Sequence, residues 1–184
     1  AFLLHYPRCF GNLCPPNGGQ PAGTWRDSWR ALETLYHRGL VKAIGVSNFS
    51  PDEFDELISV AKVKPHLVQS WMDPLMQARP LRERCKTHGV LFQAYSTLGT
   101  QWAGRGIRYN PVLKHPVILR IAKELGRSTA QVALRWALQS GVAIIPRSQK
   151  PKNMANNLMV FDFTLDSTQM AAIDALDGTD PNTI

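Results

Sequence analysis

Five short groups of polar side chains each follow an apolar segment, and their residue types could do chemistry. The groups are His5, Ser47-Asn48, Gln69, Tyr95-Ser96 and Arg147-Ser148. Histidine exchanges protons near neutral pH, and amides and hydroxyls orient polar ligands by hydrogen bonds. The planar fork of an arginine suits a phosphate. Taken singly, His5 and Tyr95 are also compatible with core positions, and Ser47-Asn48 with a simple turn.

The stretch from Val41 to Phe49 shows how such groups are positioned. Residues 43–46 form an apolar run typical of a buried strand, and the polar pair Ser47-Asn48 follows it directly. Ser50, Pro51 and Glu53 then form the pattern of a capped helix start. This succession of strand, polar tip and capped helix recurs along the chain. In a parallel β/α barrel, strand tips of this kind carry the chemistry.

The same patterns predict strands and helices along the rest of the chain. Strands are expected at residues 1–6, 43–46, 67–72, 90–95 and 142–145. Helices are expected at residues 24–38, 51–61, 81–88, 117–125, 129–139, 151–157 and 167–176. A loop rich in Gly, Pro and Asn covers residues 11–23, and a long irregular loop with an exposed Trp102 and Tyr109 covers residues 97–116.

Alternation of short apolar strands with helices predicts an α/β fold with a parallel sheet covered on both faces. No Gly-x-Gly-x-x-Gly follows a strand, which disfavours a doubly wound dinucleotide fold. A (β/α) barrel of the TIM type remains. A closed barrel needs eight units and typically ~250 residues. We therefore expect residues 1–184 to form one incomplete barrel domain with about five of eight units, preceded by further strands.

Composition limits the classes of function. The chain has 184 residues, 44% hydrophobic and 19% charged, without an apolar run long enough to span a membrane. Its net charge of +7 is spread along the chain without a nucleic-acid-binding motif, and it suits a basic surface or a bound anionic cofactor. Three cysteines argue against a secreted disulfide framework and favour the cytoplasm or another reducing compartment. His5, Cys9 and Cys14 fit no standard metal-site spacing.

Taken in order, the strand-tip motifs resemble the aldo-keto reductase family over nearly the whole chain. The motifs are Leu3-Leu4-His5-Tyr6-Pro7, Trp29-Arg30-Ala31-Leu32-Glu33, Ala43-Ile44-Gly45-Val46-Ser47-Asn48-Phe49, Ala94-Tyr95-Ser96, Ile145-Pro146-Arg147-Ser148, Asn157-Leu158 and Val160-Phe161-Asp162-Phe163. The resemblance implies NADPH-dependent reduction of small aldehydes and ketones on a (β/α)₈ barrel.

The resemblance also assigns roles to individual residues. Ser47, Asn48 and Gln69 would bind the nicotinamide carboxamide. Tyr95 would stack on the nicotinamide ring, and its neighbour Ser96 would also bind the cofactor. Arg147 and Ser148 would bind the adenosine 2′-phosphate, and Asn157 the adenine. His5 would orient the substrate carbonyl beside a proton-donating tyrosine. That tyrosine, with a lysine and an aspartate, belongs to strands that precede the His5 strand in the family.

Several positions depart from the family pattern. Trp71 and Asp73 replace a glutamate and a His or Asn, and Thr97 replaces a proline. Arg147 replaces a lysine and keeps its charge. Asn153 stands where NADPH-preferring members usually carry an arginine, so the 2′-phosphate would lose one of its cations.

Three interpretations stay open. The chain is the C-terminal part of a longer NADPH-dependent reductase, or a non-catalytic subunit with a structural or binding role in a larger assembly. The third is a split barrel, completed by a separate chain or segment that supplies the remaining strands. An uncovered strand edge favours such a partner, because it exposes unpaired backbone groups.

Overall fold

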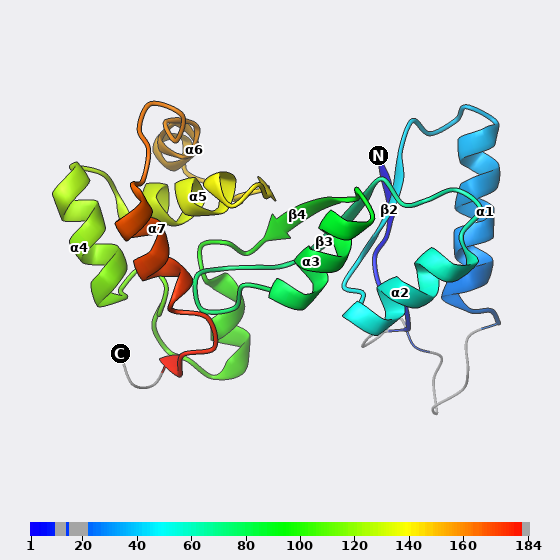
Figure 1. Ribbon diagram of the computed structural model, residues 1–184, viewed down its shortest axis with the longest axis horizontal. Helices are drawn as coiled ribbons and strands as arrows, with labels where there is room; N and C mark the ends of the chain where they lie inside the picture. Colours follow the sequence, from blue (N-terminus) through cyan, green and yellow to red (C-terminus); the bar gives the residue numbers. More distant parts are fainter. Residues whose placement is uncertain (10–13, 15–21, 182–184) are drawn as a thin grey trace. The chain divides into compact units, whose positions relative to one another are not determined.

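The computed structural model describes residues 1–9, 14 and 22–181 (Figure 1). All of the predicted strands and helices are confirmed, with ends shifted by up to a few residues. The strands are β1 (Phe2–Leu4), β2 (Ile44–Ser47), β3 (Leu67–Trp71), β4 (Leu91–Tyr95) and β5 (Ala143–Ile144). The helices are α1 (Trp25–His37), α2 (Pro51–Val60), α3 (Arg79–Thr87), α4 (Pro116–Leu125), α5 (Thr129–Gln139), α6 (Pro151–Leu158) and α7 (Ser167–Asp174). Most of the predicted loop at 11–23 lies outside the described residues.

Neighbouring strands follow one another in the sheet as they do in the chain. Within the described residues the order is β1-β2-β3-β4-β5. Leu3 of β1 pairs with Gly45 of β2, Ser47 of β2 with Gln69 of β3, and Ala94 of β4 with Ile144 of β5, each between parallel strands. Parallel neighbours need a crossover, and the helices supply it. The predicted α/β fold with a parallel sheet is therefore confirmed.

Contacts divide the chain into two compact units. The first is Ala1–Ser70 with Arg79–Phe92, and the second is Trp71–Ala78 with Gln93–Ile184. Each has a buried apolar core of its own. In the first unit it includes Trp29, Ile44, Val46, Phe54 and Leu57. In the second it includes Ile118, Ile121, Leu134, Trp136 and Ile173.

In the first unit, local sequence signals set the strand–helix geometry. Helix α2 begins as predicted, because the Ser50 hydroxyl accepts a hydrogen bond from Glu53 N at 3.2 Å and Glu53 returns one to Ser50 N at 2.8 Å. Gly45 lies so close to β3 that an added Cβ would overlap the Leu67 carbonyl oxygen. Helix α1 lies against β1 and β2 (Figure 1). The tip of β2 is thereby held between a tight strand pair and a capped helix.

In the second unit, helix α5 packs against β5 and α6, and α4 packs against α5 and α7. Asp166 caps α7, because its carboxylate accepts a hydrogen bond from Gln169 N at 2.8 Å. A 3-10 helix, η3 (Thr100–Arg105), lies within the segment predicted to be irregular. Trp102 of η3 is only 6% exposed, so the expectation that it is exposed is wrong.

Two further expectations concern cysteines and membranes. Cys9 and Cys14 form a disulfide, which the cysteine count did not predict, and Cys85 is free and buried. Within the part of the chain that the structure describes, no helix is long and apolar enough to cross a membrane.

Candidate functional site

In the first unit, three strand tips are tied together around Asn48. Its side-chain amide donates hydrogen bonds to the carbonyl oxygen of His5 at 2.9 Å and to the hydroxyl of Ser47 at 3.2 Å. Its backbone N–H donates to the Gln69 carbonyl oxygen at 3.0 Å. Asn48 has a φ of 60°, a left-handed conformation that asparagine tolerates better than most residues. Four predicted site residues are therefore brought together at one end of β1, β2 and β3.

These four residues differ in their solvent exposure. His5 is exposed, with its ring centroid 4.3 Å from that of Tyr6. Gln69 is half-buried, whereas Ser47 is 1% exposed. The Ser47 hydroxyl thus supports the side chain of Asn48 in this arrangement. The imidazole of His5 is accessible to a ligand and can donate or accept a proton there.

In the second unit, the ends of β4 and β5 share one pocket of about 560 Å³. The hydrogen bond from Ile145 N to Ala94 O, at 3.3 Å, brings the two strand ends side by side. The pocket is lined by Tyr95, Ser96, Thr97, Leu98, Thr100, Ile145, Pro146, Arg147, Ser148, Gln149, Lys150 and Asn153. Four of the predicted residues, Tyr95, Ser96, Arg147 and Ser148, are therefore brought together here.

The electrostatics of this pocket suit an anion. Arg147 and Lys150 place two cations in its wall, and helix α6 begins directly after Lys150. The N-terminus of a helix offers unpaired N–H groups and a partial positive charge. The Ser148 hydroxyl accepts a hydrogen bond from Lys150 N at 3.1 Å, which orders this entry to the helix.

Thr97 adds an unusual feature to the same wall. Its side-chain oxygen is buried and, among the described residues, has no hydrogen-bond partner. An unsatisfied buried hydroxyl costs free energy, so its position beside a pocket calls for an explanation. A pocket that takes a polar ligand fits both this hydroxyl and the two cations.

Asn157 does not line that pocket. It lies in a neighbouring apolar hollow of about 370 Å³, together with Ile144, Pro146, Met154, Leu158, Val160 and Phe161. Pro146 belongs to both hollows, so they adjoin one another. A largely apolar hollow with one amide in its wall suits a flat heteroaromatic ring.

Asp73 is a residue whose environment the sequence did not predict. It is fully buried, and its carboxylate accepts hydrogen bonds from Trp71 Nε1 at 2.8 Å, Trp102 Nε1 at 2.9 Å, Leu75 N at 2.8 Å and Met76 N at 3.2 Å. Burial raises the pKa of Asp73 to about 6, although the four hydrogen bonds oppose that rise. The only sequence signal was the joint replacement of the family's glutamate and His or Asn at positions 71 and 73.

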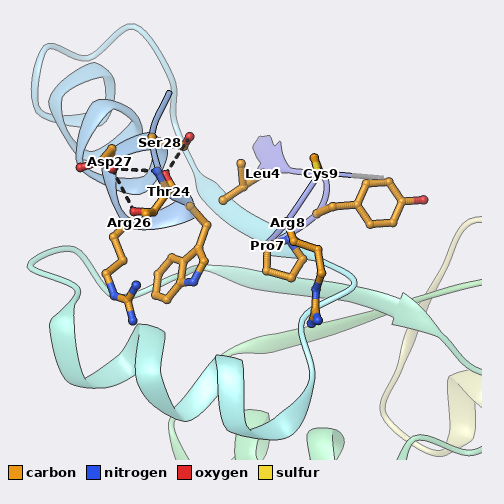
Figure 2. A pocket seen from close by; sticks show the side chains of 11 residues that line it. Leu4, Pro7, Arg8, Cys9, Thr24, Arg26, Asp27 and Ser28 are labelled. Atoms are coloured by element: carbon orange, nitrogen blue, oxygen red, sulfur yellow. Dashed lines mark hydrogen bonds between the residues drawn. The ribbon is translucent and has the colours of Figure 1, made fainter. Parts of the chain in front are cut away.

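A third pocket, of about 500 Å³, lies in the first unit where the chain leaves β1 and enters α1 (Figure 2). Tyr6 to Cys9 form one side, and Gly23 to Ser28 the other. Its carboxylate, Asp27, accepts hydrogen bonds from Thr24 N and Thr24 Oγ1 at 2.8 and 2.9 Å, which lower its pKa. Arg8 pairs with Glu53. Asp27 and Arg8 therefore already have partners within the chain. None of the predicted site residues lines this pocket.

Known proteins resemble most of the chain. A model of the aldo/keto reductase family matches residues 2–178. "Aldo-keto reductase family 1 member A1" of Rattus norvegicus is 38% identical over 185 residues, and its Homo sapiens counterpart is 36% identical over 183 residues. Each alignment covers 95% of this chain and 56% of the relative. The chain thus spans little more than half the length of these relatives.

Solved structures show the same likeness. An aldo-keto reductase of Bombyx mori (AKR2E4) in complex with NADP has a TM-score of 0.83 at 27% identity, covering 96% of this chain and 56% of that chain. Gox0644 in its apo form has a TM-score of 0.77 at 38% identity, covering 86% of this chain and 55% of that chain.

Proposed function

Because the chain belongs to the aldo/keto reductase family, we propose that it supplies the cofactor pocket and the substrate-orienting histidine of an NADPH-dependent carbonyl reductase. The observation that carries this proposal is the pocket at the ends of β4 and β5. Tyr95 and Ser96 line it from one strand end, and Arg147 and Ser148 from the next. An aromatic ring can stack on a nicotinamide ring, and hydroxyls and a cation can bind a phosphate.

The residues present fit such a nucleotide. Arg147, Ser148 and Lys150 would hold a phosphate at the start of α6, and the adjoining apolar hollow with Asn157 would hold the adenine. Tyr95 would stack on the nicotinamide, while Asn48 and Gln69, supported by Ser47, would orient its carboxamide. When bound, the cofactor supplies a hydride to the carbonyl carbon of the substrate.

In this proposal His5 acts on the substrate. Its exposed imidazole donates a hydrogen bond to the carbonyl oxygen and so fixes the face that is reduced. The Asn48 amide holds the His5 backbone at 2.9 Å and limits the movement of the imidazole. The proton for the product alkoxide comes from a tyrosine that the family resemblance assigns to a preceding strand. A positioned proton donor of this kind contributes typically ~10²–10⁴-fold.

Turnover in this proposal therefore requires a polypeptide that contains those strands together with residues 1–184. The test is NADPH consumption, followed at 340 nm, with a panel of aldehydes. The full-length protein is expected to turn over, and residues 1–184 alone are not. Turnover by residues 1–184 that His5→Ala abolishes would overturn the requirement.

The second candidate is a non-catalytic subunit with a binding or structural role. The joint replacement at Trp71 and Asp73 favours it, because this part of the third strand departs most from the family pattern. Full-length protein that binds NADPH and reduces none of the aldehydes would decide for this candidate. Co-purification of a separate chain that restores turnover would instead decide for a split barrel.

The proposed compartment is the cytoplasm or another reducing one. The Cys9–Cys14 disulfide would be reduced there, because disulfides are rare in such compartments. Alkylation of intact cells followed by mass spectrometry measures their state directly. Quantitative recovery of the disulfide would contradict the reducing compartment.

A further inference from the structure

Asp73 accepts hydrogen bonds from two indoles that belong to different elements of the second unit. Trp71 ends β3, and Trp102 belongs to η3. Both indole N–H groups donate to the same oxygen, Oδ2 of Asp73, at 2.8 and 2.9 Å. The other oxygen, Oδ1, accepts from Leu75 N at 2.8 Å and Met76 N at 3.2 Å. A buried carboxylate therefore joins the end of a strand to a short 3-10 helix.

The two oxygens of Asp73 have donors of different kinds. Oδ1 lies in a turn that is also closed by two backbone hydrogen bonds of 3.0 Å, from Asp73 N to Met76 O and from Met76 N to Asp73 O. The end of this turn is tied down further, because Gln77 N donates to Asp177 Oδ1 at 2.8 Å. Oδ2 is held by side chains alone, and one of them, Trp102, belongs to a helix type with poor internal hydrogen bonds. A change at Asp73 therefore affects η3 more readily than the turn.

Helix η3 also forms part of the wall of the candidate pocket at the ends of β4 and β5. Its first residue, Thr100, lines this pocket and donates its hydroxyl to Ser96 Oγ at 3.0 Å. Trp102 follows two positions later and is only 6% exposed. Because one turn of a 3-10 helix contains three residues, Thr100 and Trp102 share a turn. The bond that fixes Trp102 therefore also fixes Thr100 in the pocket wall.

We propose that Asp73 is a positioning residue for this pocket: through Trp102 it holds η3 and the part of the wall that contains Thr100. The identity of the pocket's ligand, a nicotinamide nucleotide, rests on the proposed reductase function. The positioning itself is a property of the ligand-free protein. It gives a reason for the joint departure from the family pattern at positions 71 and 73, because an indole donor and a carboxylate acceptor fit one another there.

Protonation of Asp73 is expected to release this anchor. All four groups bonded to its oxygens donate an N–H, so a proton on the carboxyl group must displace one of them. Burial raises the pKa of Asp73 to about 6. The charged groups on the elements packed around it are Arg105 of η3, which lies over both indoles, and Asp174 and Asp177 at the end of α7 and just beyond it. We expect the proton on Oδ2, where the donors are side chains, and a looser η3 below about pH 6.

The first test needs no ligand. ¹H–¹⁵N spectra of the full-length protein are recorded over a pH range that spans the pKa of Asp73. The two indole signals, assigned with Trp71→Phe and Trp102→Phe, are expected to titrate in the parent protein. The backbone amide signals of Ser96 and Thr100 are expected to titrate with the same midpoint, and Asp73→Asn to abolish this common titration. Indole titration without any change at Ser96 and Thr100 would overturn the proposal, because the pocket wall would then be independent of Asp73.

The second test compares NADPH binding in Trp102→Phe and Trp71→Phe. Each substitution removes one donor to the same oxygen, and only Trp102 belongs to η3. Trp102→Phe is expected to raise the Kd by about fivefold, the low end of typical couplings between two sites, and Trp71→Phe to leave it close to that of the parent. Both variants keep Asp73, so they test the anchor even if Asp73→Asn does not fold. Equal effects on the Kd would overturn the proposal.

The pH dependence of binding is a readout that a merely structural role would not change. NADH is used here, because the 2′-phosphate of NADPH itself titrates near pH 6. Asp73→Asn lacks the charged acceptor at every pH. The ratio of its Kd to that of the parent is expected to be about five above pH 6 and to approach one below it, where Asp73 of the parent is protonated.

The outcomes separate this inference from the proposed function. A common titration of the indoles and of Thr100, without binding of either nucleotide, would support the positioning role and contradict the reductase. Nucleotide binding with a ratio of Kd values for Asp73→Asn and the parent that stays near one at every pH would overturn the positioning role alone.

Discussion

The side-chain amide of Asn48 donates a hydrogen bond to the backbone carbonyl oxygen of His5 at 2.9 Å, across 43 positions of sequence. This contact ties the residue proposed to orient the substrate to a residue proposed to orient the cofactor. Asn48 is able to make it because its φ of 60° turns the chain directly after β2. The left-handed backbone of Asn48 therefore places its side-chain amide where it can bind the carbonyl oxygen of His5.

Two substitutions separate these contributions. Asn48→Gly removes the hydrogen bonds and keeps the left-handed backbone, with an expected loss of about 1 kcal/mol in the free energy of unfolding. Asn48→Ala removes the same hydrogen bonds but keeps a Cβ in that conformation, so it is expected to be about 1 kcal/mol less stable than Asn48→Gly. Urea unfolding of both variants measures the difference. Equal stabilities would show that the backbone at this position is not strained.

Tyr95 is predicted to contribute to cofactor affinity through ring stacking. Tyr95→Ala is expected to raise the Kd of the full-length protein for NADPH by about tenfold, in keeping with the loss of one aromatic contact. Fluorescence titration measures the Kd. Tyr36→Ala is the control, because Tyr36 packs against His66 in the first unit and lines neither the pocket nor the adjoining hollow. An unchanged affinity and unchanged turnover in Tyr95→Ala would refute the assignment.

Discrimination between NADPH and NADH is predicted to be modest. Arg147 and Asn153 both line the pocket, and the family's second cation is absent at position 153. One charged contact is worth roughly 1.5–3 kcal/mol, or about ten- to a hundredfold in Kd. Asn153→Arg is expected to increase the preference for NADPH by a similar factor, and Arg147→Met to reduce it. A preference of the parent protein far above a thousandfold would contradict this prediction.

The buried carboxylate of Asp73 is predicted to make stability depend on pH. Its pKa is raised from 3.8 to about 6 because burial disfavours the charged form. The folded protein therefore holds this proton more tightly than the unfolded chain does. The contribution of Asp73 is fully present below about pH 4 and is lost as the pH rises through about 6, a change of about 3 kcal/mol.

The measurement is the free energy of unfolding of the parent protein and of Asp73→Asn at several pH values. The stability of the parent relative to the variant should fall between pH 4 and pH 7. A difference that stays constant over this range would show that Asp73 titrates normally.

Gly45 is predicted to tolerate no side chain. A Cβ there would overlap the Leu67 carbonyl oxygen and the Leu3 side chain, both in paired strands. Gly45→Ala is expected to lower the free energy of unfolding by about 3 kcal/mol, the upper end for overpacking. Gly104→Ala is the matched control, because nothing lies within 4 Å of its Cβ. Equal effects of the two substitutions would contradict the close strand approach.

Much of this molecule could be predicted from its sequence, because the relevant signals are local. The capping residues Ser50 and Glu53 lie three positions apart, and the helix and strand periods are visible in short windows. The polar residues that follow the strands were recognisable for the same reason, since parallel strands bring their carboxyl ends to one edge. The order of these motifs was sufficient to recognise the family.

Tertiary structure alone decided which distant groups meet. Trp102 was predicted to be exposed, yet it is buried because its indole donates to Asp73, 29 positions away. Asn157 lies in a hollow that adjoins the pocket of Arg147 and Ser148, an arrangement that no local sequence pattern indicated. A buried polar group takes the partner that the folded chain brings within about 3 Å, and a pattern of neighbouring residues carries no information about that partner.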